Sequence, residues 1–381
     1  MTKLQSRVLT GVFLVMIFGC TGASLLKRDT SFSEKENRIL AQMPELNLKD
    51  ILSGTFEKNY ETYLSDQFFW RDGWIGVKTK AERAEGKTEI NDVYFAKDGY
   101  LIEKHSGSFD TDTAKNNITY LGNFLKSQER KVGAGHVKAM IVPNAVEILK
   151  DKLPSYAVAD EEGAYLNHIR AQIPEELLFD AEPILDAHKE EQIYYKTDHH
   201  WKTLAARYVY EAWAESIDLP IVPLSEYREE TLTTDFHGTI DAKVNINVPG
   251  DSIESYQPVT EIPYTLTYNH SEERTSLYDT SYLEGRDKYA VFFGGNQPLI
   301  EAKTEAKTDR SLLIIKDSYA NCFLSFAMQD FSQIDIVDLR YFNENLGDYM
   351  KDKDYTDICV LYNAAGFAED ASVAKLALAT D

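Results

Sequence analysis

Two separate segments of the sequence hold side chains that together suit nucleophilic catalysis. One is an acid followed by two imidazoles, Asp198-His199-His200, just before a predicted helix, and the other contains Ser318. A serine hydroxyl needs a neighbouring base to lose its proton, and a neutral imidazole oriented by a carboxylate suits that task. Asp198 and His200 lie two residues apart, so one turn can supply both the orienting acid and the base. For an isolated triplet of this kind, a helix cap and an exposed histidine are an equally good interpretation.

Ser318 lies where a predicted strand, 312–315, gives way to a predicted helix, 319–328. The first N–H groups of a helix have no partner inside it, so an oxyanion formed at Ser318 would meet unsatisfied donors and the helix dipole. Serine is also a favoured cap of a helix. Position alone favours the cap over the nucleophile.

A third candidate segment supplies hydrogen-bond donors. The apolar run 288–293 is predicted to form a strand and is followed by Gly294, Gly295 and Asn296. Glycine N–H groups and an asparagine amide at the end of a strand are suitable donors for an oxyanion hole. A simple turn at the two glycines is the alternative.

Metal binding competes for the Asp-His-His triplet, because carboxylate and imidazole are good ligands for zinc or manganese. The triplet also occurs in manganese phosphoesterases, but those enzymes need further aspartates on separate strands and an aliphatic residue before it. Lys196 and Thr197 stand there instead, so we expect no metal. The sequence lacks G-x-S-x-G, a P-loop and G-x-G-x-x-G, which leaves no support for a nucleotide cofactor, and none is expected.

Composition narrows the class of protein. The chain has 381 residues, of which 43% are hydrophobic, and a formal charge of -22. It can therefore bury a large core, whereas binding to a phosphate backbone requires basic patches, so nucleic acid is not an expected partner. Three cysteines without a C-x-x-C pair exclude a disulfide scaffold and a structural zinc site, but leave open a bridge between Cys322 and Cys359.

The N-terminus contains an apolar run, Val8–Leu26, with lysine and arginine on both sides. Such a run is typical of an export signal or membrane anchor. Three fates stay open: a retained single span, cleavage near 21–23, or lipidation at Cys20 within an imperfect lipobox. Each places the remaining chain outside the cytoplasm, as a secreted, anchored or lipid-modified protein at the extracytoplasmic face of the membrane.

The organisation after residue 28 predicts an N-terminal extension, 29–104, packed on a main domain, 105–381. The extension has a helical apolar spacing over 56–69 and a hairpin over 92–102 with an Asp-Gly turn. The main domain alternates helices and apolar strands, which favours an α/β sheet. Its predicted helices are 113–132, 163–173, 201–217, 319–328 and 346–351, and its predicted strands are 136–143, 177–185, 289–293, 312–315, 334–339 and 358–362. The stretch 222–287 is predicted to be a β-rich insertion.

Several ordered motifs resemble the DHHW protein family, whose name is written here by residues 198–201. The matching segments are Phe32–Arg38, Asp66-Gln67-Phe68, Arg71-Asp72, Asp198-His199-His200-Trp201, Lys316–Asn321 and Asp338-Leu339-Arg340-Tyr341. That family is similar to the SGNH-hydrolase-like domains of alginate O-acetylation enzymes. The resemblance implies a flavodoxin-like, mainly parallel sheet flanked by helices.

In those domains a Thr-Asp-x-His-Trp motif precedes the nucleophilic serine. The resemblance therefore implies a triad of Ser318, His200 and Asp198, with His199 at the variable position. It also implies an oxyanion hole formed by Gly294, Gly295 and Asn296. One departure is Lys316, which stands where the usual Gly-Asp-Ser has glycine.

The resemblance implies an O-acyltransferase or esterase that acts on a cell-surface glycan, with a polytopic membrane acyltransferase as a partner that supplies the acyl group. His199, Trp201, Tyr319 and Arg340 are the expected substrate-binding residues; a surface salt bridge is an equal alternative for Arg340. A different class, a non-catalytic glycan-binding or assembly protein on the same fold, also fits the many tyrosines and tryptophans. The oligomeric state stays open.

Overall fold

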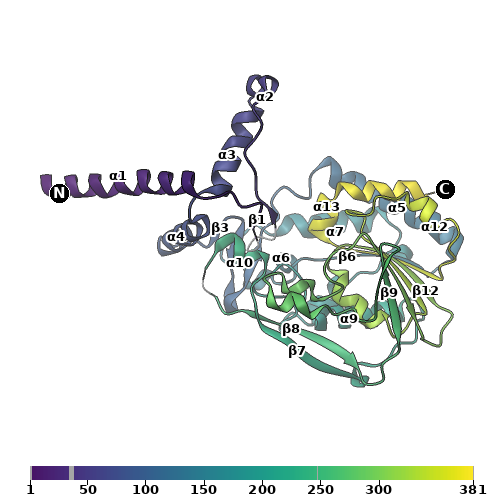
Figure 1. Ribbon diagram of the computed structural model, residues 1–381. Helices are drawn as coiled ribbons and strands as arrows, with labels where there is room; N and C mark the ends of the chain where they lie inside the picture. The colour runs from purple at the N-terminus through teal and green to yellow at the C-terminus, as the bar shows by residue number, and fades with distance from the viewer. Residues whose placement is uncertain (1, 34–37, 247, 381) are drawn as a thin grey trace. The chain divides into compact units, whose positions relative to one another are not determined.

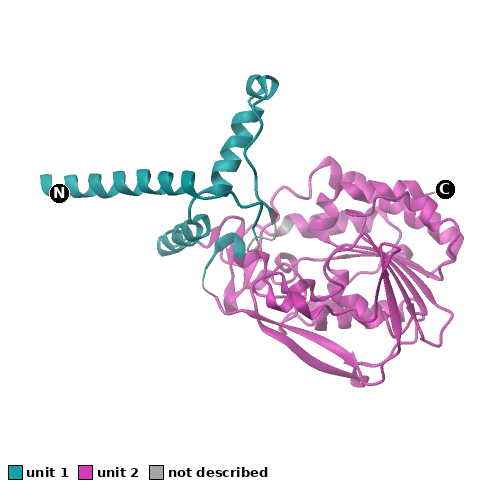
Figure 2. Cartoon of the chain, in the orientation of Figure 1, with its two compact units in different colours: residues 1–87, 242–247 teal, residues 88–241, 248–381 magenta. Residues whose placement is uncertain are grey.

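The computed structural model describes residues 2–33, 38–246 and 248–380. Two compact units make up the chain (Figure 2): one contains residues 1–87 and 242–247, and the other contains residues 88–241 and 248–381. The predicted extension, 29–104, contributes to both units. Residues 34–37 of the segment that resembles the family motif lie outside the described residues.

The first unit is mostly helical (Figure 1). Its helices are α1 (Lys3–Leu26), α2 (Leu48–Ser53), α3 (Thr55–Gln67) and α4 (Arg71–Ala84). In the described chain, α1 is the one helix long and apolar enough to cross a membrane. The spacing over 56–69 correctly predicts α3, whereas α4 was not predicted because its sequence mixes glycine and charged residues with few apolar positions.

The second unit contains a seven-stranded mixed sheet within the described residues. In spatial order its strands are β10 (Glu272–Arg274), β9 (Tyr264–Tyr268), β11 (Leu299–Thr304), β13 (Gln333–Val337), β12 (Ser311–Lys316), β14 (Asp357–Asn363) and β6 (Val137–Val142). The last four pair in parallel, and the first three continue the sheet antiparallel. The α/β prediction is confirmed, but the mainly parallel sheet is not. Strand β11 pairs antiparallel with β13, and β9 and β10, which lie in the predicted insertion, extend the sheet in the same antiparallel manner.

Both faces of the sheet are covered by helices, as a parallel β-sheet requires. Leu313 and Ile315 of β12 pack with α5 (Asp112–Val132), α7 (Asp160–Gln172) and α13 (Ala364–Glu369). The alternate residues of β12 pack with α9 (Thr203–Glu215) and α11 (Ala320–Ala327) on the other face. Because all but the first residue of β12 are buried, the end of this strand is held firmly where Ser318 follows it.

Two predicted strands are wrong. The segment 177–185 instead contains a 3₁₀ turn, Glu175–Leu177, and helix α8 (Glu182–Ala187), which has a proline in its first turn. The segment 289–293 instead begins with the 3₁₀ turn Lys288–Val291. Phe293 has a φ of 60°, which a strand residue does not adopt. The segment was predicted to be a strand because aromatic and β-branched residues are common both in strands and in other buried segments.

The remaining predicted elements are largely confirmed. A ribbon of β7 (Tyr227–Phe236) and β8 (Asp251–Pro258) forms the other part of the β-rich region. The hairpin is also present, as β4 (Val93–Phe95) and β5 (Leu101–Glu103). Cys322 and Cys359 are both buried free thiols, so no bridge joins them.

Candidate active site

The loop that carries Asp198 and His200 is fixed by a carboxylate on β8. Tyr194 pairs with Trp201 and closes the loop. Inside it, Asp251 accepts hydrogen bonds from the Lys196 N–H at 3.0 Å, the Thr197 N–H at 2.8 Å and the Thr197 hydroxyl at 2.7 Å. The ribbon that lies in the predicted insertion therefore positions the Asp-His pair.

Ser318 lies in a tight turn between β12 and α11. The turn is held by Asp317, whose carboxylate accepts from the Tyr319 N–H at 2.8 Å and from the Asn363 N–H, also at 2.8 Å. In the described structure the Ser318 N–H donates to no other group, so it is free to stabilise an oxyanion. Ser318 is largely buried, with 9% of the residue exposed.

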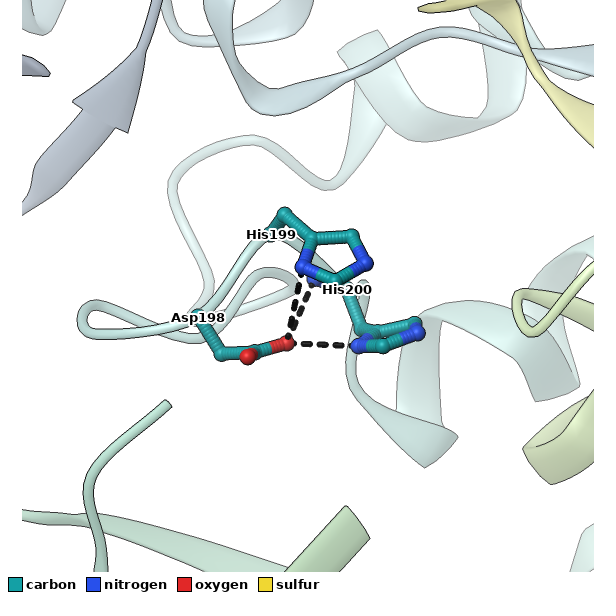
Figure 3. A group of neighbouring side chains, drawn as sticks. All are labelled: Asp198, His199 and His200. Atoms are coloured by element: carbon teal, nitrogen blue, oxygen red, sulfur yellow. Dashed lines mark hydrogen bonds and ion pairs between the residues drawn. The ribbon is translucent and has the colours of Figure 1, made fainter. Parts of the chain in front are cut away.

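The three residues form a continuous hydrogen-bonded chain. His200 Nε2 lies 2.7 Å from Ser318 Oγ, and His200 Nδ1 lies 2.5 Å from Asp198 Oδ1. Figure 3 shows how the Asp198 carboxylate faces both imidazoles. An ionised carboxylate accepts hydrogen bonds only, so Nδ1 carries a proton and Nε2 is left to accept the serine proton.

The second oxygen of Asp198 is also satisfied. It accepts from the Thr239 N–H at 3.0 Å. Gly238 allows this close approach, since a Cβ there would lie 2.2 Å from Asp198 Oδ2. Although burial raises the pKa of Asp198, the neighbouring His199 and His200 and these hydrogen bonds hold the pKa well below its usual range.

Burial has the opposite effect on the histidine. It lowers the pKa of His200 to about 4, helped by the nearby His199 and opposed by Asp198. The ring stacks on Tyr289 with centroids 3.8 Å apart, and the Tyr289 hydroxyl donates to the Ser318 carbonyl at 3.2 Å. His200 is thus held neutral near pH 7, which is the state a general base needs.

Of the expected substrate-binding residues, Trp201 and Tyr319 lie in the core, whereas His199 is partly exposed. Trp201 and Tyr319 are fully buried, and the Trp201 indole donates to the Tyr319 carbonyl at 2.9 Å. Their burial argues against contact with a substrate, and they instead join the loop of Asp198 and His200 to the turn of Ser318. His199 is partly exposed and bonds Thr239 Oγ1 at 2.9 Å, so it can reach a substrate.

Of the three residues expected to form an oxyanion hole, the two glycines form a turn, whereas Asn296 lies next to Lys316 and Asn321. Gly294 and Gly295 have φ values of 69° and 85°, as expected for a turn, and the Gly295 N–H already donates to the Phe292 carbonyl at 3.1 Å. Asn296 lies beside the end of β12: its Oδ1 is 3.4 Å from Lys316 Nζ and 3.4 Å from Asn321 Nδ2. Both neighbours are donors, so they orient the Asn296 oxygen toward themselves and leave its amide N–H groups free to point elsewhere.

Lys316 stands where the family motif has glycine, and in the structure its ammonium group contacts an amide and a carboxylate. It is buried, donates to Asn321 Oδ1 at 2.9 Å and lies 3.6 Å from Asp338 Oδ2. Burial lowers its pKa. Arg340 donates two hydrogen bonds to the same Asp338, at 2.8 and 2.6 Å. It therefore forms the salt bridge that was the alternative to substrate binding, and its side chain is 32% exposed.

A group of amides behind the serine turn was not predicted from the sequence. Asn144 follows strand β6, and Asn363 is the last residue of strand β14. The Asn144 amide donates to Tyr319 Oη at 3.2 Å and to Asn363 Oδ1 at 3.1 Å. Buried Glu162 accepts from the Asn144 N–H at 2.6 Å, and burial raises its pKa to about 8. Polar residues at the carboxyl ends of two predicted parallel strands were the signal that could have revealed this group.

Asp198, His199 and His200 also offer ligand atoms within 4.8 Å of one another. A metal at this triplet would have to replace the hydrogen bonds that both nitrogens of His200 make with Asp198 and Ser318. The donors present therefore fit a proton-transfer chain better than a metal centre.

The fold and site together define an α/β protein with a Ser-His-Asp arrangement at the carboxyl edge of its parallel strands. A family model described as DHHW protein matches residues 108–337, and the chain belongs to this family. No curated protein matches the chain.

Solved structures that are similar to this chain include the following three. A DHHW family protein from Eubacterium siraeum is 27% identical, with a TM-score of 0.60 over 75% of this chain and 95% of that one. Bacillus cereus PatB1, solved with a sulfonyl adduct, is 19% identical, with a TM-score of 0.59 over 74% of this chain and 99% of that one. The O-acetyltransferase domain of Pseudomonas putida AlgJ is 12% identical, with a TM-score of 0.47 over 73% and 92%.

We expect Gly238→Ala to disturb the site through Asp198. The added methyl group would overlap the Asp198 carboxylate, so the variant should lose roughly 1–3 kcal/mol of stability, as overpacked sites do. Chemical denaturation measures this loss. Gly285→Ala is the matched control, because its Cβ would meet only an ordinary contact at 3.6 Å; equal stability of the two variants would contradict the crowding at Asp198.

The pKa of His200 has a measurable consequence. Because the folded protein holds this pKa near 4, while an unfolded histidine titrates near 6.5, the unfolded state binds more protons between these values. The contribution of His200 to the free energy of unfolding should therefore fall as the pH is lowered from about 6.5 toward 4. Imidazole NMR titration of wild type and His200→Gln assigns the resonance, and a pKa at or above 6.5 would contradict the burial effect.

Proposed function

We propose that the chain is an extracytoplasmic, membrane-tethered O-acyltransferase or esterase that acts on a cell-surface polysaccharide through Ser318, His200 and Asp198. The observation that carries the proposal is the unbroken hydrogen-bonded chain from Ser318 Oγ to the Asp198 carboxylate. A helix cap alone would not require a buried, neutral imidazole at the serine hydroxyl. The polysaccharide substrate follows from the resemblance to alginate O-acetylation domains.

In the first half of the reaction, His200 Nε2 takes the proton of Ser318 as Oγ bonds to the carbonyl carbon of an acyl ester. The tetrahedral oxyanion is stabilised by the Ser318 N–H and the Asn296 amide. When the bond from that carbon to the donor alcohol's oxygen breaks, the alcohol leaves with the proton from His200. Ser318 now holds the acyl group as an ester.

In the second half, His200 takes a proton from a sugar hydroxyl or from water, whose oxygen bonds to the acyl carbon. The carbon–Oγ bond then breaks, and Ser318 regains the proton from His200. A sugar acceptor makes the protein a transferase, and water makes it an esterase. An acyl donor outside the cell would come from the proposed membrane acyltransferase partner.

The solved relative with a sulfonyl adduct supports the same chemistry in general terms. Sulfonyl reagents attach covalently to an activated nucleophilic side chain. Ser318, whose hydroxyl lies against a neutral imidazole, is the corresponding candidate in this chain.

We expect Ser318→Ala and His200→Ala each to lower the release of acetate from an activated acetyl ester by about 10³-fold or more, because the members of a triad act together. Ser325→Ala, in α11 and buried like Ser318, is the matched control and should keep wild-type activity. Equal rates in all the proteins would overturn the catalytic proposal and favour the non-catalytic glycan-binding alternative.

A sulfonyl fluoride gives an independent readout of the nucleophile. The Ser318 oxygen should displace fluoride from sulfur, with His200 taking the proton, and peptide mass spectrometry should locate the adduct on residue 318. His200→Ala should react much more slowly. Labelling of another residue at the wild-type rate in Ser318→Ala would assign the nucleophile elsewhere.

Lys316→Met should lower kcat with little change in KM, because the loss of Nζ removes one of the two donors that orient the Asn296 oxygen. Removal of one oxyanion donor typically costs about 10²- to 10³-fold in kcat, so Asn296→Ala sets the upper limit of the effect. If Lys316 acts through Asn296, the double variant should be no slower than Asn296→Ala alone. Additive losses would show that Lys316 acts by another route.

A further inference from the structure

The first unit contains an exposed aromatic corner, which we define as Phe68, Phe69 and Trp70 between α3 and α4. Their side chains are 37%, 43% and 59% exposed. Trp70 has a φ of 55°, and its indole lies over Gly73, where a Cβ would come within 2.1 Å of the ring. The glycine thus allows the indole to lie against the start of α4, and the ring is also held by Trp74 at 5.8 Å.

This corner is bonded to the C-terminal end of α1. The Phe69 N–H donates to Ser24 Oγ at 2.9 Å. A few residues further on, Gln67 and Thr30 exchange two hydrogen bonds, at 2.9 and 2.8 Å. The corner therefore lies beside the point where the chain leaves the apolar helix.

A cavity of about 1270 Å³ lies next to the corner within the same unit. Its walls combine apolar and aromatic side chains with charged ones. The basic lining residues are Lys27, Arg28, Arg71 and Lys78, and the acidic ones are Asp29 and Glu61. Arg71 is paired with Asp66 and Asp72 at 3.8 and 3.3 Å, so the local positive charge comes mainly from Lys27 and Arg28 at the end of α1 and from Lys78. Its sign is opposite to the formal charge of -22 of the whole chain.

The length of α1 sets where the corner would lie in a membrane. Its 24 residues correspond to about 36 Å, which is slightly longer than the hydrocarbon core of a bilayer, about 30 Å. A retained α1 would therefore bring its C-terminal end, and the corner bonded to it, to the headgroup layer. Tryptophan and basic residues are enriched at that depth.

We propose that the aromatic corner and its cationic cavity form a second contact with the membrane, in which the rings enter the interface and the basic side chains meet anionic phospholipid headgroups. The anchor then fixes the orientation of the first unit on the bilayer as well as its distance from it. The position of the corner beside the C-terminal end of α1 favours lipid over a protein partner, because tryptophan and basic residues at this depth meet the headgroup layer. The proposal rests on the membrane tethering in the proposed function and is independent of the triad.

Tryptophan quenching tests this contact in the full-length chain. The chain has four tryptophans, of which Trp201 and Trp213 are buried, so quenching by lipid reports on Trp70 and Trp74. The protein is reconstituted alone into phosphatidylcholine vesicles, with and without phosphatidylglycerol. The phosphatidylcholine acyl chains carry bromine either near the headgroups or near the bilayer centre. Intact mass confirms that α1 is present.

We expect strong quenching by the shallow bromines, weaker quenching by the deep ones, and an increase with phosphatidylglycerol. Trp70→Phe should remove much of the quenching, and Trp70→Phe/Trp74→Phe should remove nearly all of it. No quenching of the wild type in these vesicles would overturn the proposal and point to a protein partner for the corner. Equal quenching in the double variant would also overturn it, because the signal would then come from elsewhere.

Failure of this contact is distinct from failure of the catalytic proposal. The acetyl-ester assay depends on Ser318 and His200, whereas Trp70→Phe should leave that activity in detergent unchanged. If the protein isolated from cell membranes lacks α1, the contact proposed here is overturned while the triad is unaffected.

Discussion

The burial of an ionised carboxylate at Asp198 is the constraint on which the site depends. A buried charge is costly unless hydrogen bonds and nearby cations compensate it, and here one oxygen is satisfied by His200 and the other by Thr239. These contacts fix the tautomer of His200, and the tautomer makes Nε2 the acceptor for Ser318. The glycine at 238 is required for the same reason, since only a residue without Cβ leaves room for the carboxylate.

The sheet explains why residues more than a hundred positions apart meet. The carboxyl ends of neighbouring parallel strands lie at one edge, where α/β proteins place their functional groups. Ser318 follows β12, Asn363 ends β14 and Asn144 follows β6, so three strands deliver polar side chains to one place. The Asp-His loop comes from outside the sheet, and it is the contact of Asp251 on β8 with that loop that fixes its position.

The residues proposed for the triad could be singled out from the sequence because they lie in short local motifs with known chemistry. Ser318, at the junction of strand and helix, and the Asp198–His200 pair are brought together by the structure at hydrogen-bonding distance. The mixed order of the sheet was beyond prediction, because antiparallel strands such as β9 pair with partners far along the chain and leave no local signal. The same holds for Asn144 and Glu162, whose importance depends entirely on burial and on neighbours that periodicity does not reveal.

Lys316 shows how a departure from a motif acquires a physical reason. A glycine before the Asp-Ser pair would leave space behind the nucleophile turn, whereas the lysine fills it with a buried cation that must be compensated. Asp338 supplies the opposite charge. The ammonium group of Lys316 also donates to Asn321 Oδ1 and, at a longer distance, to Asn296 Oδ1. Because the ammonium group has donors and no acceptor, every amide around it must turn its oxygen inward. The cation thereby turns the Asn296 oxygen toward itself, and it orients this amide as Asp198 orients the imidazole of His200.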